Sequence, residues 1–322
     1  MSDTKELVLK YLEENKDSFS SGEEIANHLK LSRNSVWKAI KSLRNSGYQI
    51  EAATHRGYHL VGDMDLITLK GISDNLLPGI AQDRIHVYKQ IESTNKTAKG
   101  AAAFDAPHGT CIIAESQTLG SGRKKRPFFS PKGGIYMSVI LTPDKLPFKN
   151  TSLVTAYIAV CVCNSIEALT GKKPMIKWSN DIYIDNRKIC GILTESAGDL
   201  DTGELSWIVA GIGINFAVDT GTFPKEMRSH AGSLFVPEKA PLSKNDLIAE
   251  ILNNILLKGK NIDILKSYRN RSLVLSKDVT VYDKDNSYPA KAVSIDDMGK
   301  LVVSLPDGSS KTLTHEEIRI EL

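Results

Sequence analysis

Two closely spaced glycines followed by four basic residues form the part of this 322-residue sequence best suited to chemistry. In the segment 114–131, Gly120 and Gly122 precede an Arg-Lys-Lys-Arg run at 123–126. Glycine lets backbone amides approach a ligand closely, and four cations would neutralise negative charge on it. The Walker A pattern Gly-x-x-x-x-Gly-Lys-Ser/Thr does not occur here, so we expect an anion-binding loop other than a P-loop. Taken alone, the basic run could as well be a nuclear targeting signal or a solvated charge cluster as an anion site.

Three further polar motifs accompany this loop. Residues 92–95 read Glu-Ser-Thr-Asn, residues 177–181 read Lys-Trp-Ser-Asn-Asp, and residues 187–193 read Arg-Lys-Ile-Cys-Gly-Ile-Leu. Each motif is short and says little by itself, and an isolated Lys188 would be interpreted as an exposed lysine at a strand edge. The motifs indicate a functional site only if helices and strands bring them together in the fold.

Those elements are predicted by the pattern between Arg84 and Arg271, where apolar segments of strand length alternate with segments of helix length. This alternation indicates a mixed α/β domain. The expected strands are 85–91, 110–114, 135–141, 175–178, 188–194 and 206–210, and the expected helices lie near 95–103, 152–169 and 245–257.

The N-terminal part of the chain predicts a small helical unit that ends in a hairpin. Residues 21–24 (Ser-Gly-Glu-Glu) form a capping box, Ser32 caps the next helix, and residues 30–31 alone separate the two helices. This short connection is typical of a helix-turn-helix. With residues 48–61 as a β-hairpin, the unit is expected to be a winged helix.

Positive charge is concentrated on the second helix of this pair. Residues 30–44 contain five basic side chains and no acidic one, on the face opposite the apolar Val36, Ile40 and Leu43. This arrangement predicts a recognition helix for a DNA major groove, and a solvated basic face on a protein-interaction module is the alternative. The expected DNA-binding residues are Ser32, Arg33, Asn34, Trp37, Lys38, Lys41, Arg44 and, beside His55 at the hairpin tip, Arg56.

The C-terminal 50 or so residues contain short strand patterns separated by polar turns, which predicts a small β-barrel. The expected organisation is a winged helix-turn-helix at 1–62, a linker helix at 63–82, an α/β domain at 83–271 and the barrel at 272–322.

Composition narrows the function classes. The chain is 41% hydrophobic and 25% charged with a net charge of +3, which excludes a disordered tail, a collagen and a uniformly basic coat for nucleic acid. The start lacks the apolar core of a signal peptide, and the most apolar segment, 153–169, is interrupted by polar residues. We therefore expect a cytoplasmic protein with no membrane contact. The four cysteines form no Cys-x-x-Cys pair and are expected to be buried, reduced thiols.

Four motifs in this order, between a winged helix and a β-barrel, resemble the bifunctional biotin protein ligases, the biotin operon repressors that also activate biotin and attach it to carrier proteins. The resemblance covers nearly the whole chain. It implies an α+β multi-domain fold with a central mixed α/β catalytic domain of the class II synthetase type and a C-terminal SH3-like barrel.

The resemblance also implies roles for individual residues. Lys188 matches the lysine that binds the reacting carboxylate and the α-phosphate, and Arg123 matches the second arginine of the family's Gly-Arg-Gly-Arg-x-Gly-Arg loop; both are expected to be catalytic. The implied biotin-binding residues are Ser93, Thr94, Asn95, Gln117, Gly120, Ser121, Gly122, Arg123 and Lys188. The implied nucleotide-binding residues are Arg123, Arg126, Phe128, Asn180 and Asp181, with Asp181 also near the metal, and 211–215 matches the family's glycine-rich strand.

The loop and one further motif depart from the family pattern. Ser121 replaces the first arginine, Lys125 replaces the third glycine, and Phe128 stands where tryptophan is common. Ser179 replaces the proline of Trp-Pro-Asn-Asp. We expect the loss of arginine hydrogen bonds at 121 to raise ligand off-rates, and Lys125 to restrict the backbone.

The implied function is ATP-dependent biotin ligation with Mg²⁺, combined with repression of biotin genes. Biotin and ATP would form biotinyl-adenylate, which a lysine of a biotin carboxyl carrier domain then attacks. The adenylate is expected to favour a homodimer that binds a two-fold-symmetric operator DNA. A biotin-sensing transcription factor with little turnover and a lipoate-type ligase are the alternatives.

Overall fold

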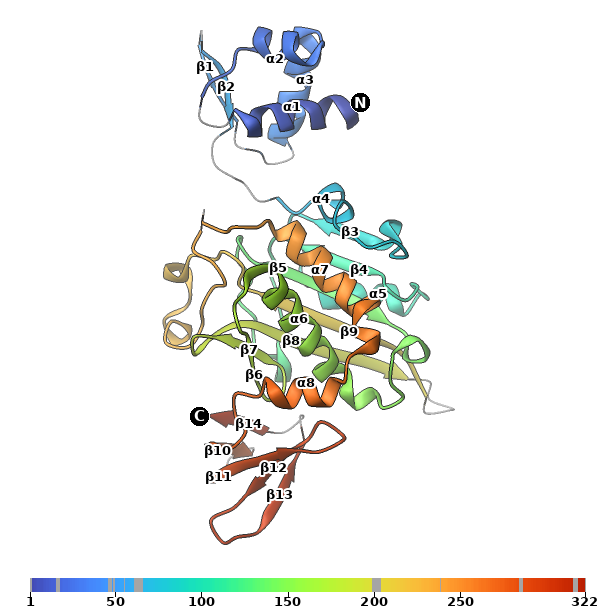
Figure 1. Ribbon diagram of the computed structural model, residues 1–322, viewed down its shortest axis with the longest axis vertical. Helices are drawn as coiled ribbons and strands as arrows, with labels where there is room; N and C mark the ends of the chain where they lie inside the picture. Colours follow the sequence, from blue (N-terminus) through green and yellow to red (C-terminus); the bar gives the residue numbers. More distant parts are fainter. Residues whose placement is uncertain are drawn as a thin grey trace. The chain divides into compact units, whose positions relative to one another are not determined.

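The computed structural model describes residues 2–15, 18–45, 48, 50–54, 56–60, 66–198, 204–237, 239–283, 286–314 and 318–321, and the chain divides into two compact units, 1–66 and 67–322 (Figure 1). The three-domain division with a separate barrel at 272–322 stays a prediction, because the second unit contains this segment as well. Of the expected DNA-contacting hairpin tip, His55 lies outside the described residues.

The first unit is the expected helix-turn-helix followed by a hairpin, which is confirmed. Helices α1 (Ser2–Glu14), α2 (Gly22–Leu29) and α3 (Arg33–Asn45) precede the antiparallel strands β1 (Ile50–Ala53) and β2 (Gly57–Leu60). Ser21 and Glu24 make the predicted capping box, and Lys30 takes a left-handed conformation that ends α2 and turns the chain into α3. The core consists of one apolar side of each helix: Val8, Leu12, Ile25, Val36, Ile40 and Leu43, closed by Ile50 and Leu60.

Among the described residues of the second unit, seven strands form a mixed sheet in the order β3-β4-β5-β9-β8-β7-β6. Strands β3 and β4 pair in parallel, and the other neighbouring strands of this sheet pair antiparallel in the residues that the structure describes. The strands are β3 (Ile85–Tyr88), β4 (Cys111–Ala114), β5 (Ile135–Leu141), β6 (Met175–Lys177), β7 (Asp181–Ile184), β8 (Arg187–Gly198) and β9 (Leu205–Ile214). The expected mixed α/β domain is confirmed, and β7 is a strand that the sequence analysis missed.

Helices cover both faces of this sheet. The long helix α6 (Val154–Thr170) packs with α7 (Lys244–Leu256) and α8 (Ile264–Asn270) against one face, and α5 (Thr94–Ala102) packs against the other (Figure 1). Strand alternation explains the division, because Cys111 and Ile113 of β4 join the core under α6 whereas Ile112 joins the cluster under α5. The segment Thr151–Thr170 is long and apolar enough to span a membrane, and here it is mostly buried as a core helix.

The segment expected to be a linker helix contains the short helix α4 (Leu69–Ser73), followed by a turn of 3-10 helix at Gln82–Arg84. Thr68 caps α4 through its side chain, which accepts a hydrogen bond from Gly71 N. Residues 63–65 of the predicted linker lie outside the described residues.

The C-terminal segment is all-β, as expected. In the part of it that the structure describes, five antiparallel strands follow the order β13-β12-β11-β10-β14. Their bounds are β10 (Asp278–Asp283), β11 (Asn286–Ile295), β12 (Leu301–Ser304), β13 (Ser310–Leu313) and β14 (Ile318–Glu321). Alternate side chains on one face, including Val279, Val281, Leu301 and Val303, are buried in the core of the second unit.

Candidate active site

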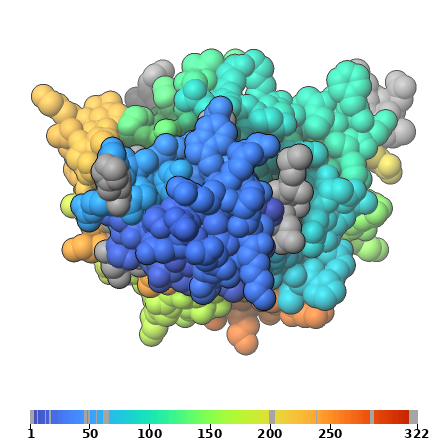
Figure 2. Space-filling view, turned by 90° about the horizontal axis from the view of Figure 1, so that it is seen from above, coloured from blue at the N-terminus to red at the C-terminus, as the bar shows by residue number. Residues whose placement is uncertain are grey.

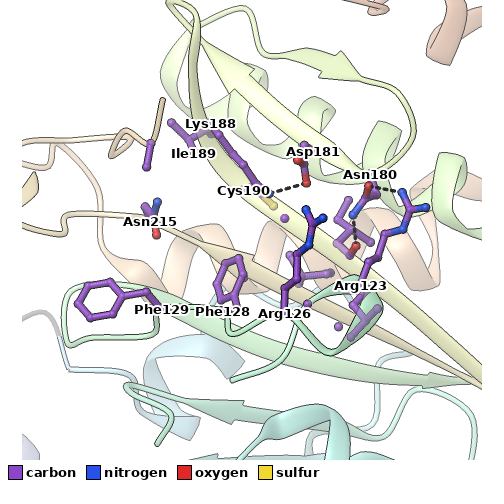
Figure 3. Close-up of a pocket in the computed structure, with 18 of the residues that line it drawn as sticks. Arg123, Arg126, Phe128, Phe129, Asn180, Asp181, Lys188, Ile189, Cys190 and Asn215 are labelled. Carbon is purple, nitrogen blue, oxygen red and sulfur yellow. Dashed lines mark hydrogen bonds and ion pairs between the residues drawn. The ribbon is translucent and has the colours of Figure 1, made fainter. Parts of the chain in front are cut away.

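A pocket of about 930 Å³ lies in the second unit where five segments of the chain meet (Figure 3). It is lined by the N-terminus of α5, the loop 117–129, the connection between β6 and β7, and the strands β8 and β9. All four polar motifs of the sequence therefore contribute to one cavity. Its size is in the range of a site for a cofactor or a small-molecule ligand.

At one end of the pocket, the Ser-Thr-Asn motif begins α5 and is joined to the glycine loop. Ser93 caps the helix by accepting a hydrogen bond from Lys96 N. Both the backbone N and the hydroxyl of Thr94 donate to Oε1 of Gln117, at 2.8 and 3.1 Å. Gln117 Nε2 in turn donates to Ser130 Oγ at 2.9 Å. These bonds fix the relative positions of two segments that lie more than 20 residues apart.

Asn95 is held from three sides. Its Nδ2 donates to the carbonyl of Leu193 at 3.3 Å and to Glu195 Oε2 at 2.9 Å, and its Oδ1 accepts from the buried Ser138 hydroxyl at 2.6 Å. Lys99 Nζ forms an ion pair with Glu195 at 2.6 Å. Ser138 and Glu195 were not predicted, because neither belongs to a recognisable motif and only the sheet register brings them beneath α5.

Glycines on β8 and β9 allow close approach on the floor of the pocket. A Cβ at Gly211 would clash with the side chain of Asn95, and a Cβ at Gly213 would clash with the ring of Phe128. The Phe128 ring also lies against Gly191, where a Cβ would come within 3.1 Å of it. The glycine-rich strand is therefore required by packing around the pocket.

The basic run forms a tight turn beside these strands. Gly122 N donates to the carbonyl of Arg126, and Phe128 N donates to the carbonyl of Gly120, both at 2.8 Å. Lys124 and Lys125 both have φ near +55°. Lys125 stands where the resemblance places glycine, and its left-handed backbone is the conformation that glycine adopts without cost.

Two arginines of the turn reach into the pocket (Figure 3). Arg123 Nη1 donates to Ser179 Oγ at 3.0 Å and to Asn180 Oδ1 at 3.1 Å. Asn180 Nδ2 donates to the carbonyl of Ile192 at 2.7 Å, which turns the amide oxygen toward the guanidinium. Arg126 lies beside Phe128 with its guanidinium inside the pocket.

At the same end, Lys188 Nζ lies 2.7 Å from Asp181 Oδ1 (Figure 3). The lysine is on β8 and the aspartate begins β7, and both side chains are partly exposed to the pocket. The neighbouring Cys190 is buried, and this burial raises the pKa of its thiol well above the usual value, so the thiol stays protonated and unreactive. The expected burial of the other cysteines, Cys111, Cys161 and Cys163, is also observed.

The C-terminal strands contact the pocket through one of its walls. Trp178 Nε1 donates to the carbonyl of Gly299, in the turn between β11 and β12, at 3.0 Å. The motif is held from the helical side as well, because Tyr268 of α8 donates its hydroxyl to the carbonyl of Ser179 at 2.7 Å, and burial raises the pKa of this hydroxyl. Trp178 thus connects the C-terminal sheet to the motif 177–181.

The pocket gathers nearly all the expected ligase residues. Those lining it are Ser93, Thr94, Asn95, Gln117, Ser121, Gly122, Arg123, Arg126, Phe128, Asn180, Asp181 and Lys188; Gly120 lies in the same loop. Their individual roles stay predictions. The lining also includes apolar residues that the sequence analysis did not select, among them Phe129, Tyr136, Ile189, Ile192, Leu193 and Ile212. Tyr136, Ile189, Ile192 and Leu193 lie within predicted strands, which was the available signal, whereas Phe129 and Ile212 lie outside the predicted strands.

In the first unit, which is drawn in blue in Figure 2, α3 carries exposed basic and aromatic side chains. Trp37 is 51% exposed, and Lys41 Nζ lies 5.2 Å from the centre of its ring. Asn34 and Lys38 are exposed beside them. Ser32 Oγ accepts a hydrogen bond from Ser35 N and so caps the helix.

All three expected DNA-binding arginines already have partners within the unit. Arg44 Nε donates to the carbonyl of Ile50 at 2.8 Å and so ties α3 to the hairpin. Arg33 lies 3.8 Å from Glu23, and the Arg56 guanidinium stacks 4.3 Å from the ring centre of Phe19. DNA binding by these residues stays a prediction; Arg44 bonds to Ile50 through Nε and keeps further guanidinium donors for a phosphate.

Comparisons with known proteins agree with this geometry. The model of the biotin/lipoate A/B protein ligase family matches residues 87–215, and a model of an HTH domain matches residues 4–59. The bifunctional ligase/repressor BirA of Bacillus spizizenii is 33% identical over 302 residues, covering 91% of each chain. Its counterpart from Bacillus subtilis is 32% identical over 304 residues, covering 92% of each chain. A solved biotin protein ligase from Aquifex aeolicus, in complex with biotin and ATP, shares the fold with a TM-score of 0.61 and 23% identity over 74% of this chain and 98% of that one.

Proposed function

The chain belongs to the family of bifunctional biotin ligases and repressors, and on this premise we propose that it joins biotin to a carrier protein using ATP and represses biotin genes. The observation that carries the ligase function is the pocket itself, which brings the Ser-Thr-Asn motif, the arginine turn and Lys188 around one cavity.

Biotin binds at the α5 end of the pocket in this proposal. Thr94, Asn95 and Gln117 provide fixed polar groups for the ring system, since their side chains are already oriented by bonds to one another and to β8. The apolar Leu193 and the ring of Phe128 supply the surface against which an aliphatic chain packs. The biotin carboxylate then points toward Lys188.

Negative charge is the obstacle to the first reaction step, in which the biotin carboxylate attacks the α-phosphate of ATP and pyrophosphate leaves. Two unit negative charges 4 Å apart repel by about 4 kcal/mol at an effective dielectric constant of 20. Lys188 would hold both the carboxylate and the α-phosphate, and Arg123 and Arg126 would neutralise the phosphates. Hydrogen bonds to charged groups of this kind contribute about 1.5 to 3 kcal/mol each.

Magnesium is part of this proposal as a companion of the nucleotide. No cluster of three possible His, Cys, Asp or Glu ligands occurs among the described residues, whereas Asp181 lines the pocket next to Lys188. This fits an ion that takes one carboxylate from the protein and its remaining oxygens from phosphate and water. When bound, the ion would supply further positive charge to the triphosphate.

In the second step, the ε-amine of a lysine on a biotin carboxyl carrier domain attacks the acyl carbon of biotinyl-adenylate, and AMP leaves. The adenylate is a mixed anhydride that water hydrolyses. The turn 120–126 covers the pocket from one side and would exclude water until the carrier arrives.

Repression is assigned to the first unit, with α3 in the major groove of operator DNA. We further propose that biotinyl-adenylate favours a homodimer, which presents two copies of this unit to a two-fold-symmetric site, and that the protein is cytoplasmic. Sedimentation with and without biotin plus ATP tests the dimer: a shift toward dimer is expected, and an unchanged monomer would contradict it.

One assay tests the ligase function against its alternatives. The protein is incubated with ATP, a carrier domain, and either biotin or lipoate, and the mass of the carrier is measured. We expect the mass of the carrier to increase through one modified lysine when biotin is supplied, and to stay unchanged when lipoate is supplied. Modification by lipoate instead would identify a lipoate-type ligase, and no modification despite biotin binding would identify a sensor without turnover.

A further inference from the structure

Arg123 is anchored by a side chain that the family pattern does not provide. Its Nη1 atom carries two hydrogens, and the structure gives that atom two acceptors, Ser179 Oγ at 3.0 Å and Asn180 Oδ1 at 3.1 Å. A guanidinium is planar, so two bonds at one nitrogen fix the orientation of the whole group. Ser179 stands where the resemblance places proline, whose side chain has no hydrogen-bonding group.

The acceptors themselves are rigidly placed. Ser179 is 2% exposed, and its carbonyl accepts the hydroxyl of Tyr268 at 2.7 Å. Asn180 is tied to β8 by two bonds to Ile192, one from its side chain at 2.7 Å and one to its carbonyl at 2.9 Å. The hydroxyl of Ser179 therefore presents a fixed acceptor on the wall of the pocket facing the arginine turn.

We propose that Ser179 is a positioning residue for Arg123. Its hydroxyl holds the Arg123 guanidinium, and with it the turn 120–126, against the end of the pocket proposed to bind the nucleotide. This role rests on the proposed ligase function and adds a residue to it. Ser179 itself contacts no reacting atom in this account; it acts through Arg123. The family arginine at the start of the turn is replaced by Ser121. Adenylate that stays bound therefore depends more strongly on a fixed Arg123.

The test is a double-mutant cycle read out as the dissociation rate of biotinyl-adenylate from the full-length protein, together with kcat and KM for ATP. Ser179→Ala removes the acceptor, and we expect about tenfold faster dissociation and a raised KM for ATP, equivalent to about 1.4 kcal/mol. Ser179→Thr keeps a hydroxyl and should restore most of the wild-type rate. In an Arg123→Ala background, Ser179→Ala should add less than a twofold change, because the hydroxyl then has no guanidinium to hold.

Three outcomes would overturn this role. The first is an adenylate dissociation rate in Ser179→Ala equal to that of the wild type. The second is an equal change in this rate on Ser179→Ala with and without Arg123. The third is adenylate dissociation from Ser179→Thr as fast as from Ser179→Ala. Ser179→Pro, which introduces the family residue, should behave like Ser179→Ala: its effect on the dissociation rate should largely disappear in the Arg123→Ala background. The thermal midpoint of each variant is measured alongside, so that a loss of folding is recognised. A wild-type protein that makes no adenylate would refute the ligase function itself, a result distinct from any of these three.

Discussion

Lys188 Nζ lies 2.7 Å from Asp181 Oδ1, so the lysine that faces the pocket is oriented by a carboxylate on the adjacent strand. An ammonium group has three donors, and a contact with Asp181 leaves donors for a substrate carboxylate and a phosphate at the same time. The pair lies at the end of the pocket that we propose for the nucleotide, and the ammonium group is next to the carboxylate proposed to accompany magnesium.

Asp181→Asn should separate substrate binding from reaction. The substitution keeps the shape of the side chain but removes its charge, so biotin should bind within about threefold of the wild-type affinity while adenylation slows by tenfold or more. Calorimetry with biotin and biotin-dependent ATP/pyrophosphate exchange measure the two effects. Wild-type exchange in Asp181→Asn would show that the carboxylate has no part in the reaction, and Asp181→Glu, which keeps the charge, is the control for it.

Gly213→Val tests the packing of the pocket floor. A side chain at this position must displace the ring of Phe128, so biotin affinity should fall by at least tenfold. Gly100→Ala is the matched control, because a Cβ there meets no atom within 4 Å and Gly100 lies within α5. That control should bind biotin normally and gain up to about 1 kcal/mol of stability from its better helix propensity. Equal affinities in the two variants would contradict the placement of Phe128.

His108 should make stability depend on pH. Burial, followed by the nearby Lys145 and Lys260, lowers the pKa of its imidazole from the usual 6.5, and Nδ1 accepts a hydrogen bond from Thr142 N at 3.1 Å. Between the lowered pKa and about 6.5 the unfolded chain binds more protons than the folded one, so the free energy of unfolding decreases as the pH falls through this window.

The measurement for His108 is the urea midpoint at several pH values between 5 and 7.5. His108→Asn should show a smaller decrease than the wild type over this range. His86→Asn, at an exposed position of β3, is the matched control and should keep the wild-type pH dependence. An identical pH dependence of His108→Asn and the wild type would rule out the assigned cause.

Lys41→Ala tests the DNA-binding surface of α3. If Lys41 contacts a DNA phosphate, its loss should weaken binding to the promoter of the biotin genes several-fold and reduce the salt slope by about 1. Lys10→Ala, on the exposed side of α1, is the control and should leave both quantities unchanged. Fluorescence anisotropy at several salt concentrations, with biotin and ATP present, gives both. If the two variants behave alike, α3 is not the DNA-contacting helix.

Local patterns predicted most elements of the fold, because caps, apolar periodicity and turn residues act over a few neighbours. Strand β7 was missed because it is only four residues long and begins with the aspartate of a polar motif. The sequence signal for it was the Asp185-Asn186 dipeptide, which is typical of a hairpin turn and lies between apolar residues. In the structure both residues have positive φ and the turn joins β7 to β8. The pairing of β5 with β9 joins segments some 70 residues apart, and no local pattern specifies it.

The same reasoning explains which site residues could be found. Lys188, Arg123 and the Ser-Thr-Asn motif are short, recognisable runs, and the resemblance gave them roles. Ser138 and Glu195 act on Asn95 only through the register of three strands and a helix, so they were invisible in the sequence. Ser179 was recognised as a departure, and only the structure showed that its hydroxyl contacts Arg123.

The most direct test of the account is biotin-dependent ATP/pyrophosphate exchange by the wild type and Lys188→Ala. If Lys188 holds the reacting carboxylate and phosphate, the wild type exchanges pyrophosphate and Lys188→Ala loses at least about 100-fold in rate, as expected for removal of a key charge-stabilising donor. Lys291→Ala, at an exposed strand position outside the pocket, controls for the loss of any surface lysine and should exchange normally. Exchange by Lys188→Ala at the wild-type rate would contradict the central claim that this pocket activates biotin through Lys188.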